Sequence, residues 1–273
     1  MPRPARPLEP APLNERAAGA RVKTRVWHPD GIVREGVWAL AEEVPIEVRL
    51  NGASFAVMMA TPNDLEDFAV GFALTEAVVD DAGAIEGIQI IPSDDGIVVA
   101  LTIPEDALAA GADRTRGLAG RSGCGVCGVT ALGDAVRAAR PVPAQPPIAP
   151  EAIATAFAHL SDHQPMNRVN RSVHAAALAG RDGAVRLARE DVGRHNALDK
   201  LIGACARNNA LPVEGFVVLS SRTSFEMVLK AATAGAALIA SVSAPTTLAL
   251  DCARNAGIKL AAAGPDGRVV LID

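Results

Sequence analysis

The chain has 273 residues, of which 49% are hydrophobic, 21% are charged and only 3% are aromatic, with no tyrosine. That apolar content indicates a folded chain, and the length suits one large domain or two smaller ones. With 26 Lys and Arg against 31 Asp and Glu, the formal net charge is −5. We therefore expect neither a general basic surface for nucleic acid nor the aromatic platform on which single strands stack.

Two segments, the N-terminus and one apolar run, indicate whether the chain is exported or spans a membrane. Residues 1–20 contain Pro and Arg without a continuous apolar core, which indicates a flexible tail rather than a secretory signal. Residues 231–250 carry no charge and reach the length of a membrane span. Because that run is rich in Ala, Ser and Thr and contains Pro245, we expect a buried helix, strand and loop there. The prediction is a cytoplasmic protein with reduced thiols, no membrane segment and no nucleic-acid partner.

Residues 21–112 are predicted to form a small α+β domain. Apolar and polar residues alternate on both sides of Asn51-Gly52, which is typical of a β-hairpin. Thr61-Pro62-Asn63-Asp64 then opens a segment whose apolar residues recur at helical spacing. The predicted elements are strand 43–50, strand 54–60, a helix from residue 61 to about 73, strand 88–91 and strand 97–103.

A connector at 113–149 separates this domain from a predicted α/β domain at 150–273. Strands and helices alternate in the last third, as in a parallel α/β sheet. A capping box at Thr223-Ser-Phe-Glu226 starts one helix, which ends near Gly235, and Thr246 or Thr247 caps another, which stops at Gly257. The strands are predicted at 215–220, 237–242, 258–262 and 268–272.

Hydroxyl side chains follow two of these strands. Ser220-Ser221-Arg222-Thr223 follows the first, and Ser243 with Thr246-Thr247 follows the second. Ligands of open α/β sheets lie beyond the carboxyl ends of the strands, where helix N-termini offer free N–H groups to anions. The pattern suits a phosphate or pyrophosphate, although the same residues would also serve as ordinary helix caps.

The sharpest motif is Arg121-Ser-Gly-Cys124-Gly-Val-Cys127-Gly. A CxxC pair is half of a zinc site, a redox pair, or a pair of sulfur-handling thiols. No second CxxC and no His-x-x-x-His accompanies it, and Cys205 and Cys252 lie in apolar helical stretches typical of core positions. The flanking glycines suit a thiolate that attacks an activated sulfur and passes it on. The motif alone leaves zinc, inert structure and thiol chemistry open.

A second polar constellation runs from Arg189 to Lys200. Glu190, Asp191, Arg194 and His195 would orient one another as an acid/base or ligand-binding group. The alternative is a capped helix whose first turn is solvated and salt-bridged. His174 lies in an otherwise apolar strand, where a hydrogen-bonded core histidine is the commoner case.

Five motifs together resemble a known family. They are GCGVCG at 123–128, VHAAAL at 173–178, EDVGRHNALDKLIG at 190–203, SSRTSFEMVLKAATAG at 220–235 and SAPTTLAL at 243–250. In this order they are similar to the formate dehydrogenase accessory sulfurtransferase family, FdhD, from about Glu43 to the C-terminus. The resemblance favours the sulfur-handling interpretation of Cys124 and Cys127.

The resemblance implies a specific activity. Members take sulfur from a cysteine desulfurase as a persulfide, which here would form on Cys124 with Cys127 assisting. They pass it to the molybdenum or tungsten bis-guanine-dinucleotide cofactor that formate dehydrogenase requires. The family also implies a C-terminal domain like that of cytidine deaminases, a homodimer and no permanent metal.

The implied cofactor site lies near the C-terminus. By position it corresponds to Ala263, Gly264, Pro265, Asp266, Gly267 and Arg268. The further candidate ligands are Ser220, Ser221, Arg222, Thr223, Ser243 and His195. The chain departs from the family pattern at Asn170-Arg171-Ser172, where Thr-Gly-Gly or Thr-Gly-Ala is common, and at Ala263, where an aromatic residue is frequent. These departures affect the contacts to the cofactor but leave the CxxC pair intact.

Two rival functions remain. A zinc-dependent deaminase requires His-x-Glu followed by Pro-Cys-x-x-Cys, whereas His174 precedes Ala-Ala and the CxxC comes earlier in the chain without a preceding Pro. A non-catalytic module would carry the cofactor and leave the cysteines incidental.

Overall fold

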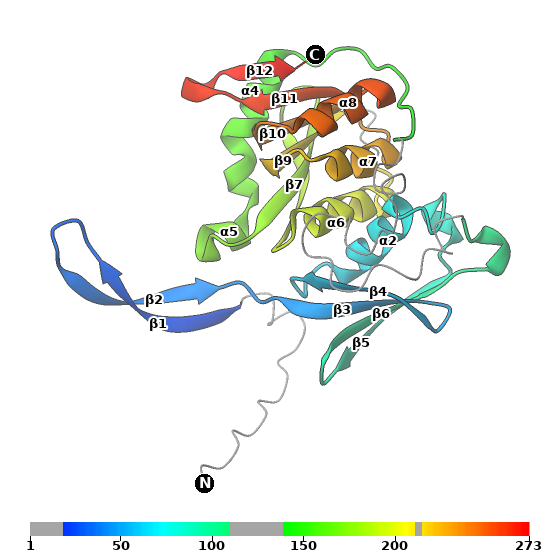
Figure 1. Ribbon diagram of the computed structural model, residues 1–273, viewed down its shortest axis with the longest axis horizontal. Coiled ribbons are helices and arrows are strands. Elements are labelled where there is room, and N and C mark those ends of the chain that lie inside the picture. The colour runs from blue at the N-terminus through cyan, green and yellow to red at the C-terminus, as the bar shows by residue number, and fades with distance from the viewer. Residues whose placement is uncertain (1–18, 110–138, 211–214, 273) are drawn as a thin grey trace, which may run out of the picture.

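The computed structural model describes residues 19–109, 139–210 and 215–272. Their strands form a two-stranded hairpin, a four-stranded sheet and a six-stranded sheet (Figure 1). The mixed α/β fold predicted from the sequence is confirmed. Of the tail predicted at 1–20, residues 1–18 lie outside the described residues, whereas Ala20 begins a strand. The cysteines Cys124 and Cys127 also lie outside the described residues.

The four-stranded sheet and helix α2 (Leu65–Thr75) make the small unit predicted for the first hundred residues. Its strands are β3 (Val44–Leu50), β4 (Ala53–Ala60), β5 (Gly87–Ser93) and β6 (Gly96–Thr102), in the order β4-β3-β6-β5. Asn51 and Gly52 have φ angles of 49° and 86°, as the predicted hairpin turn requires. One face of the sheet packs against α2 through Phe55, Phe68 and Phe72. The helix begins at Leu65 rather than at residue 61, after Asp64 in the left-handed conformation. Two 3₁₀ turns complete the unit, at Ala82–Ala84 and Glu105–Ala107.

Strands β1 (Ala20–Trp27) and β2 (Val33–Leu40) form an antiparallel hairpin that extends away from both sheets (Figure 1). We call residues 20–40 the arm. Helix α5 (Pro165–Asn170) packs against β2. The sequence prediction contained no element in this segment, so the arm is a feature that it missed.

The six-stranded sheet is mixed rather than parallel throughout. Its strands are β7 (His174–Gly180), β8 (Val185–Asp191), β9 (Gly215–Arg222), β10 (Leu238–Ser243), β11 (Lys259–Ala263) and β12 (Val269–Ile272), in the order β12-β11-β10-β9-β7-β8. Strands β9, β10 and β11 are parallel, as predicted. The other three are antiparallel to their neighbours. The links β7–β8 and β11–β12 are short turns, and such turns join only antiparallel strands, whereas a parallel link needs a crossover.

Helices cover both faces of this sheet (Figure 1). Helices α6 (Arg194–Arg207), α7 (Phe225–Thr233) and α8 (Thr247–Ala256) share one apolar core with it, and α4 (Pro150–His159) packs on the other face. Short 3₁₀ helices lie at Leu160–His163 and Pro265–Gly267. The charge-free run at 231–250 becomes the end of α7, β10 and the start of α8, which confirms the prediction of a buried helix, strand and loop. None of the helices in the described ranges is long and apolar enough to cross a membrane.

The two sheet-containing units meet where α2 crosses α6. A Cβ atom on Gly71 of α2 would lie 1.7 Å from the backbone oxygen of Asp199, and one on Gly203 of α6 would lie 1.8 Å from that of Asp67. Neither distance is possible for real atoms, so the backbones touch only because both positions are glycine. This crossing fixes the small unit against the helices of the larger sheet.

Candidate functional site

One edge of the six-stranded sheet gathers most of the predicted ligand residues. The parallel strands β9, β10 and β11 end there at Arg222, Ser243 and Ala263. Because β7 is antiparallel to β9, its first residue, His174, lies at the same edge, and Asp191 at the end of β8 pairs with it. Helices α6, α7 and α8 begin directly after this edge. The sequence prediction that these segments meet at the carboxyl ends of the strands is therefore correct in topology.

The turn between β9 and α7 contains a buried hydroxyl without a partner. Thr223 is 1% exposed, and neither its Oγ1 nor the Oγ of Ser224 has a hydrogen-bond partner among the described residues. The predicted capping box is wrong, because α7 begins at Phe225 with Ser224 at the N-cap and no side-chain capping bond. The backbone oxygen of Thr223 instead accepts a hydrogen bond from the N–H of Thr246 (3.1 Å), which holds the starts of α7 and α8 together.

The other serines of this edge are largely used by the fold. Ser220 Oγ accepts a hydrogen bond from the N–H of Ala175 (2.8 Å), and Ser221 Oγ donates to the backbone oxygen of Arg222 (3.1 Å). Thr246 is a true helix cap, since its Oγ1 accepts from the N–H of Ala249 (3.2 Å). The ordinary-cap interpretation is therefore right for Thr246. Arg222 is exposed and pairs in register with Ser243, which is also exposed.

The turn at 263–268 follows β11 and so belongs to the same edge. The N–H of Gly264 donates to the backbone oxygen of Arg268 (2.7 Å). The Arg268 side chain bonds Pro265 O (3.1 Å) and pairs with Asp266 (3.2 Å). Both charged side chains of that pair are mostly exposed. These bonds within the turn stabilise its conformation and leave Arg268 accessible to solvent.

A histidine and a carboxylate face each other across the first turns of α6 and α7. Nε2 of His195 lies 3.1 Å from Oε2 of Glu226, at ion-pair distance but without hydrogen-bond geometry. Both side chains are nearly buried, at 12% and 14% exposed. Sequence reasoning missed Glu226 as a site residue because it placed this side chain in the capping box. The pair therefore lies at this edge, between the N-termini of α6 and α7.

His174 is half-buried at this edge beside Asp191. Burial lowers the pKa of His174 from its ordinary value, and the charges of Arg194 and His195 lower it further, against the opposing effect of Asp191. The imidazole is therefore neutral near pH 7, where it accepts or donates hydrogen bonds without adding a positive charge.

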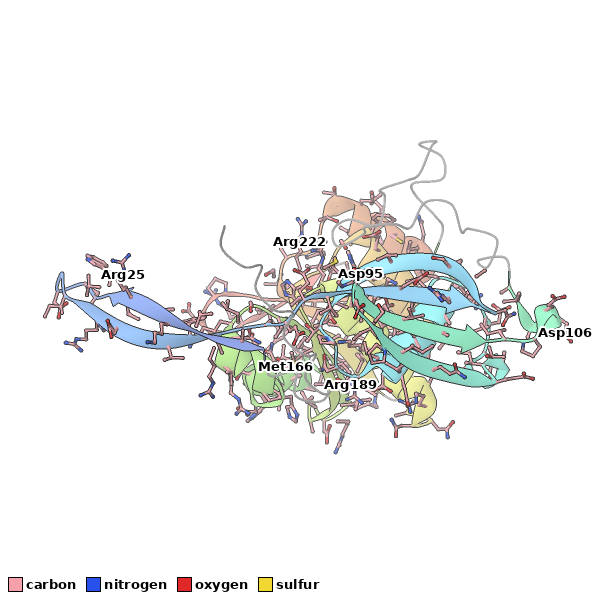
Figure 2. The ribbon with its side chains drawn as sticks, turned by 90° about the horizontal axis from the view of Figure 1, so that it is seen from below. Arg25, Asp95, Asp106, Met166, Arg189 and Arg222 are labelled. Atoms are coloured by element: carbon pink, nitrogen blue, oxygen red, sulfur yellow. The ribbon has the colours of Figure 1, made fainter. Side chains whose placement is uncertain are left out.

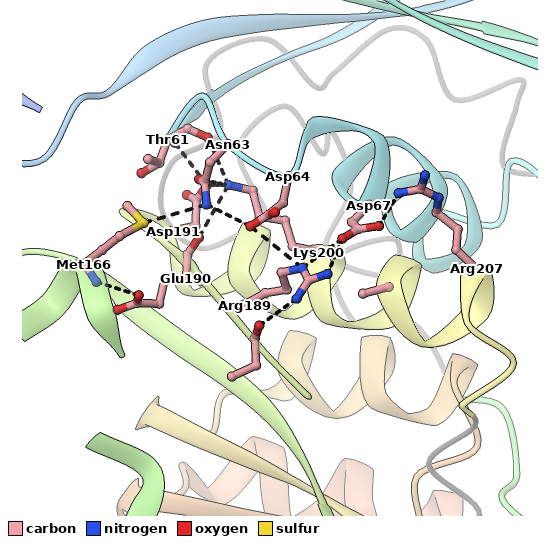
Figure 3. Close-up of polar contacts among 12 residues, drawn as sticks. Thr61, Asn63, Asp64, Asp67, Met166, Arg189, Glu190, Asp191, Lys200 and Arg207 are labelled. Carbon is pink, nitrogen blue, oxygen red and sulfur yellow. Dashed lines mark hydrogen bonds and ion pairs between the residues drawn. The ribbon is translucent and has the colours of Figure 1, made fainter. Parts of the chain in front are cut away.

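The acidic side chains of the EDVGRH motif are buried rather than exposed to solvent at this edge. Glu190 and Asp191 are buried, at 4% and 0% exposed. Glu190 accepts hydrogen bonds from the N–H groups of Met166 and Asn167, and so caps α5 (Figure 3). The solvated, salt-bridged turn that we gave as the alternative is therefore wrong for both carboxylates. The acid/base role predicted for them is also not supported by their position.

Asp191 instead belongs to a buried network between the two units. Its Oδ2 lies 2.7 Å from Nζ of Lys200, and both side chains are fully buried. Nζ also donates to Thr61 O and to Asn63 Oδ1, each at 2.9 Å, and Thr61 N–H donates to Asp191 (Figure 3). Groups of the small unit therefore contribute hydrogen bonds to both members of this pair, and Gly193 N–H and Asn196 donate to the other oxygen of Asp191. A polar stripe at helical spacing on α6 (Asn196, Asp199, Lys200) carries the only sequence signal for this buried face.

A second buried pair is formed by Asp199, the residue of α6 that precedes Lys200. Nζ of Lys230 on α7 lies 2.9 Å from both carboxylate oxygens of Asp199, and Thr75 Oγ1 donates to Asp199 at 2.7 Å. Burial alone would lower the pKa of Lys230, but Asp199 and Glu76 outweigh burial and raise it. The lysine therefore stays charged, and α2, α6 and α7 share one ion pair.

The two described cysteines are core residues, as predicted. Cys205 and Cys252 are 2% and 8% exposed within the helix core. Burial raises the pKa of Cys205 to about 12 and also raises that of Cys252. Neither is a reactive thiolate near neutral pH. Within the ranges that the structure covers, no three His, Cys, Asp or Glu side chains gather as a group that could hold a metal ion.

Comparison with known proteins identifies the family. The family model FdhD/NarQ matches residues 41–270. A sulfur carrier protein FdhD of Chromobacterium violaceum is 50% identical over 237 residues, which cover 86% of this chain and 88% of that protein. One of Bordetella petrii is 45% identical over 221 residues, covering 81% and 80%. The crystal structure of a protein from Desulfotalea psychrophila, described as a formate dehydrogenase accessory protein, matches with a TM-score of 0.69 at 24% identity, over 93% of this chain and 96% of that one. The chain therefore belongs to the FdhD/NarQ family.

Proposed function

We propose that this protein is a sulfur carrier in the maturation of formate dehydrogenase. The observation that carries the proposal is Cys124-Gly-Val-Cys127, a thiol pair between glycines, in a chain about half identical to a sulfur carrier protein FdhD. A cysteine desulfurase is the proposed donor, and formate dehydrogenase is the proposed destination. The acting form is proposed to be a cytoplasmic homodimer.

The loading step exchanges one sulfur bond for another. The Cys124 thiolate attacks the terminal sulfur of a persulfide on the desulfurase, the S–S bond there breaks, and the desulfurase thiolate leaves. A new S–S bond joins that sulfur to Cys124, so no external oxidant or reductant is needed. Cys127 assists as the neighbouring thiol. For unloading, the Cys127 thiolate attacks the inner sulfur of the Cys124 persulfide, so that a Cys124–Cys127 disulfide forms and the outer sulfur leaves as hydrosulfide. The proposed acceptor of that sulfur is a molybdenum or tungsten bis-guanine-dinucleotide cofactor.

The sheet edge supports the binding of this acceptor. Its pyrophosphates are anions, and three helices begin along the edge, where the positive ends of the helix dipoles favour anions. Thr223 adds a buried hydroxyl without a partner, which a ligand oxygen would satisfy. Arg222 and Arg268 add exposed positive charge at the same edge. The proposed ligands are these three residues with Ser224, Ser243 and His195.

Mass spectrometry tests the carrier role. Incubation of the full chain with a cysteine desulfurase and cysteine should add about 32 Da, the mass of one sulfur atom on a thiolate. Cys124→Ala should abolish the adduct, and Cys205→Ala, which alters a buried thiol, should leave it. An adduct that survives Cys124→Ala would contradict the proposal.

Complementation separates the carrier from a module that only holds the cofactor. In cells without the native protein, wild type should restore formate dehydrogenase activity and Cys124→Ala should not. Restoration by Cys124→Ala would favour the non-catalytic module.

Calorimetry with GDP as the probe tests the acceptor site, where Thr223→Val should weaken binding about fivefold, the effect of losing one hydrogen bond. Thr102→Val, on the four-stranded sheet, is the matched control.

A further inference from the structure

The pair formed by His195 and Glu226 contains a hydrogen-bonding group that the fold does not use. Nε2 of His195 lies 3.1 Å from Oε2 of Glu226, yet it has no hydrogen-bond partner among the described residues. The two side chains are 12% and 14% exposed, so the missing bond is not simply replaced by bulk water. Buried polar groups are normally hydrogen-bonded, and each exception needs a physical reason. At this edge, a ligand that completes the bonds is such a reason.

Glu226 differs from other carboxylates near this edge in the group that it faces. Asp191 pairs with Lys200 at 2.7 Å, and Asp266 pairs with Arg268 at 3.2 Å. Glu226 faces a histidine instead. The first two carboxylates are thus paired with permanent cations of the chain. The third is placed beside a ring nitrogen that is itself without a hydrogen bond.

A second pair of side chains fixes the geometry of the first. Asp199 and Lys230 lie four positions after His195 and Glu226 on the same two helices. Both pairs therefore lie across the contact of α6 with α7, one helical turn apart. Nζ of Lys230 lies 2.9 Å from both carboxylate oxygens of Asp199. Because this buried pair holds the two helices in register, His195 and Glu226 present their polar atoms at a fixed spacing.

A carboxylate at an anion site must face the part of the ligand that is not anionic, because like charges repel. The exposed arginines lie along another part of the edge. Arg222, labelled in Figure 2, is at the end of β9, and Arg268 follows β11. His195 lies in the first turn of α6, which packs on β7 and β8, the strands on the other side of β9. The edge thus separates a basic part from a part with a carboxylate, as a nucleotide separates its diphosphate from its base.

Guanine has the hydrogen-bonding pattern that this pair complements. Its Watson–Crick edge presents one acceptor, O6, beside two donors, the N1–H group and the N2 amine. With the proton on Nε2, His195 can donate to O6, while the two carboxylate oxygens of Glu226 accept from N1–H and from the N2 amine. Adenine has a C–H group where guanine has the N2 amine, and hypoxanthine lacks this amine too. With either of these bases, one carboxylate oxygen is left without a donor.

We infer that Glu226, with His195 beside it, recognises the guanine base of the nucleotide bound at this edge. The inference rests on the proposed function, which supplies a guanine dinucleotide as the acceptor, and it names the residue that selects this base. Thr223 then serves the diphosphate rather than the base. Nucleotides of adenine or hypoxanthine are bound more weakly, because they leave a largely buried carboxylate oxygen unsatisfied.

Calorimetry with GDP, IDP and ADP on the full chain tests the inference. GDP and IDP differ only in the N2 amine and share the ribose and the diphosphate. Wild type should bind GDP at least about tenfold more tightly than IDP or ADP, the effect of a hydrogen bond to a charged group. Glu226→Gln should bind GDP no more tightly than IDP, because the amide offers only one acceptor to the two donors of guanine.

Two further variants serve as controls. Glu151→Gln removes an exposed carboxylate from the first turn of α4 and should keep the wild-type preference for GDP. Thr223→Val should weaken all three nucleotides by the same factor, since they share the diphosphate. Binding of ADP by Glu226→Gln shows that this variant is folded and that the diphosphate part of its site is intact.

Three results would overturn the inference alone. They are a wild type that binds GDP and IDP equally, a Glu226→Gln protein that keeps the preference for GDP, and an equal loss of both nucleotides in that variant, which would place Glu226 at the ribose. Failure of all three nucleotides to bind wild type would overturn the inference together with the acceptor of the proposed function. Sulfur loading of Cys124 is read separately by mass, so the two failures are distinguishable.

Discussion

Buried polar groups occur in two regions, the helix crossing between α2 and α6 and the edge of the six-stranded sheet. The two regions differ in how these groups are hydrogen-bonded. At the crossing, Lys200 and Asp191 are fully buried and each is hydrogen-bonded several times over. At the edge, the Thr223 hydroxyl is equally buried, and no group in the described part of the chain bonds it. Because burial of an unpaired polar group is unfavourable, the first arrangement is typical of structure and the second of a ligand site.

The largest effect should come from breaking the satisfied network. Lys200→Met removes the cation and leaves Asp191 charged and buried, so the free energy of unfolding should fall by about 4 kcal/mol. Lys259→Met, at an exposed position, is the matched control and should change it by less than about 0.5 kcal/mol. Denaturant unfolding followed by circular dichroism measures both. Equal stability of the two variants would mean that the crossing does not hold the units together.

The backbone contact at the crossing should be nearly as sensitive. Gly203→Ala places a Cβ against the backbone oxygen of Asp67, which has no flexible side chain to move aside. The free energy of unfolding should fall by about 3 kcal/mol. Gly87→Ala is the control, since the nearest atom to its added Cβ is 3.6 Å away. A Gly203→Ala protein as stable as Gly87→Ala would contradict the close approach.

Replacing threonine by valine, once in each region, compares the two regions directly. Thr75→Val removes a hydroxyl that bonds Asp199 and Lys230, and should lower the free energy of unfolding by about 2 kcal/mol. Thr223→Val removes a buried hydroxyl without a partner and should leave it unchanged or raise it by about 1 kcal/mol. A loss at Thr223 as large as that at Thr75 would show that its hydroxyl supports the fold.

The smallest expected effect is a pH dependence from His174. Its folded pKa is lowered, chiefly by burial, so the unfolded chain binds a proton that the folded chain does not. Stability from this residue is full above its unfolded pKa and is lost as pH falls from there through the folded pKa. Acidification from pH 7.5 to pH 5, a range spanning the ordinary histidine pKa of about 6.5, should therefore destabilise wild type more than His174→Gln. Identical pH profiles would contradict the lowered pKa.

The residues that gather at the sheet edge could largely be predicted from the sequence, whereas the buried network at the helix crossing could not. The hydroxyls after β9 and β10 follow apolar runs of strand length, so their meeting at one edge could be predicted. Lys200 and Asp199 looked like residues of a solvated helix, because the α2 surface that buries them lies more than 120 positions away in the chain. A local pattern cannot reveal a partner at that separation.

The arm was missing from the sequence prediction for a different reason. Arg21 to Val26 alternates polar and apolar side chains, and Pro29-Asp30-Gly31 is a turn sequence, so a hairpin signal was present. The prediction assigned residues 1–20 to a flexible tail and placed no strand in the segment that follows them. The CxxC pair remains a prediction from sequence and family, because Cys124 and Cys127 lie outside the described residues.

The arm carries both tryptophans of a chain that has no tyrosine. Ultraviolet fluorescence of the protein therefore originates almost wholly from Trp27 and Trp38, and it reports the surroundings of the arm rather than the state of either core. Emission should shift to shorter wavelength when the arm is covered, even though the fold does not change. An unlabelled sample thus contains its own optical probe, placed on a hairpin that extends away from both sheets.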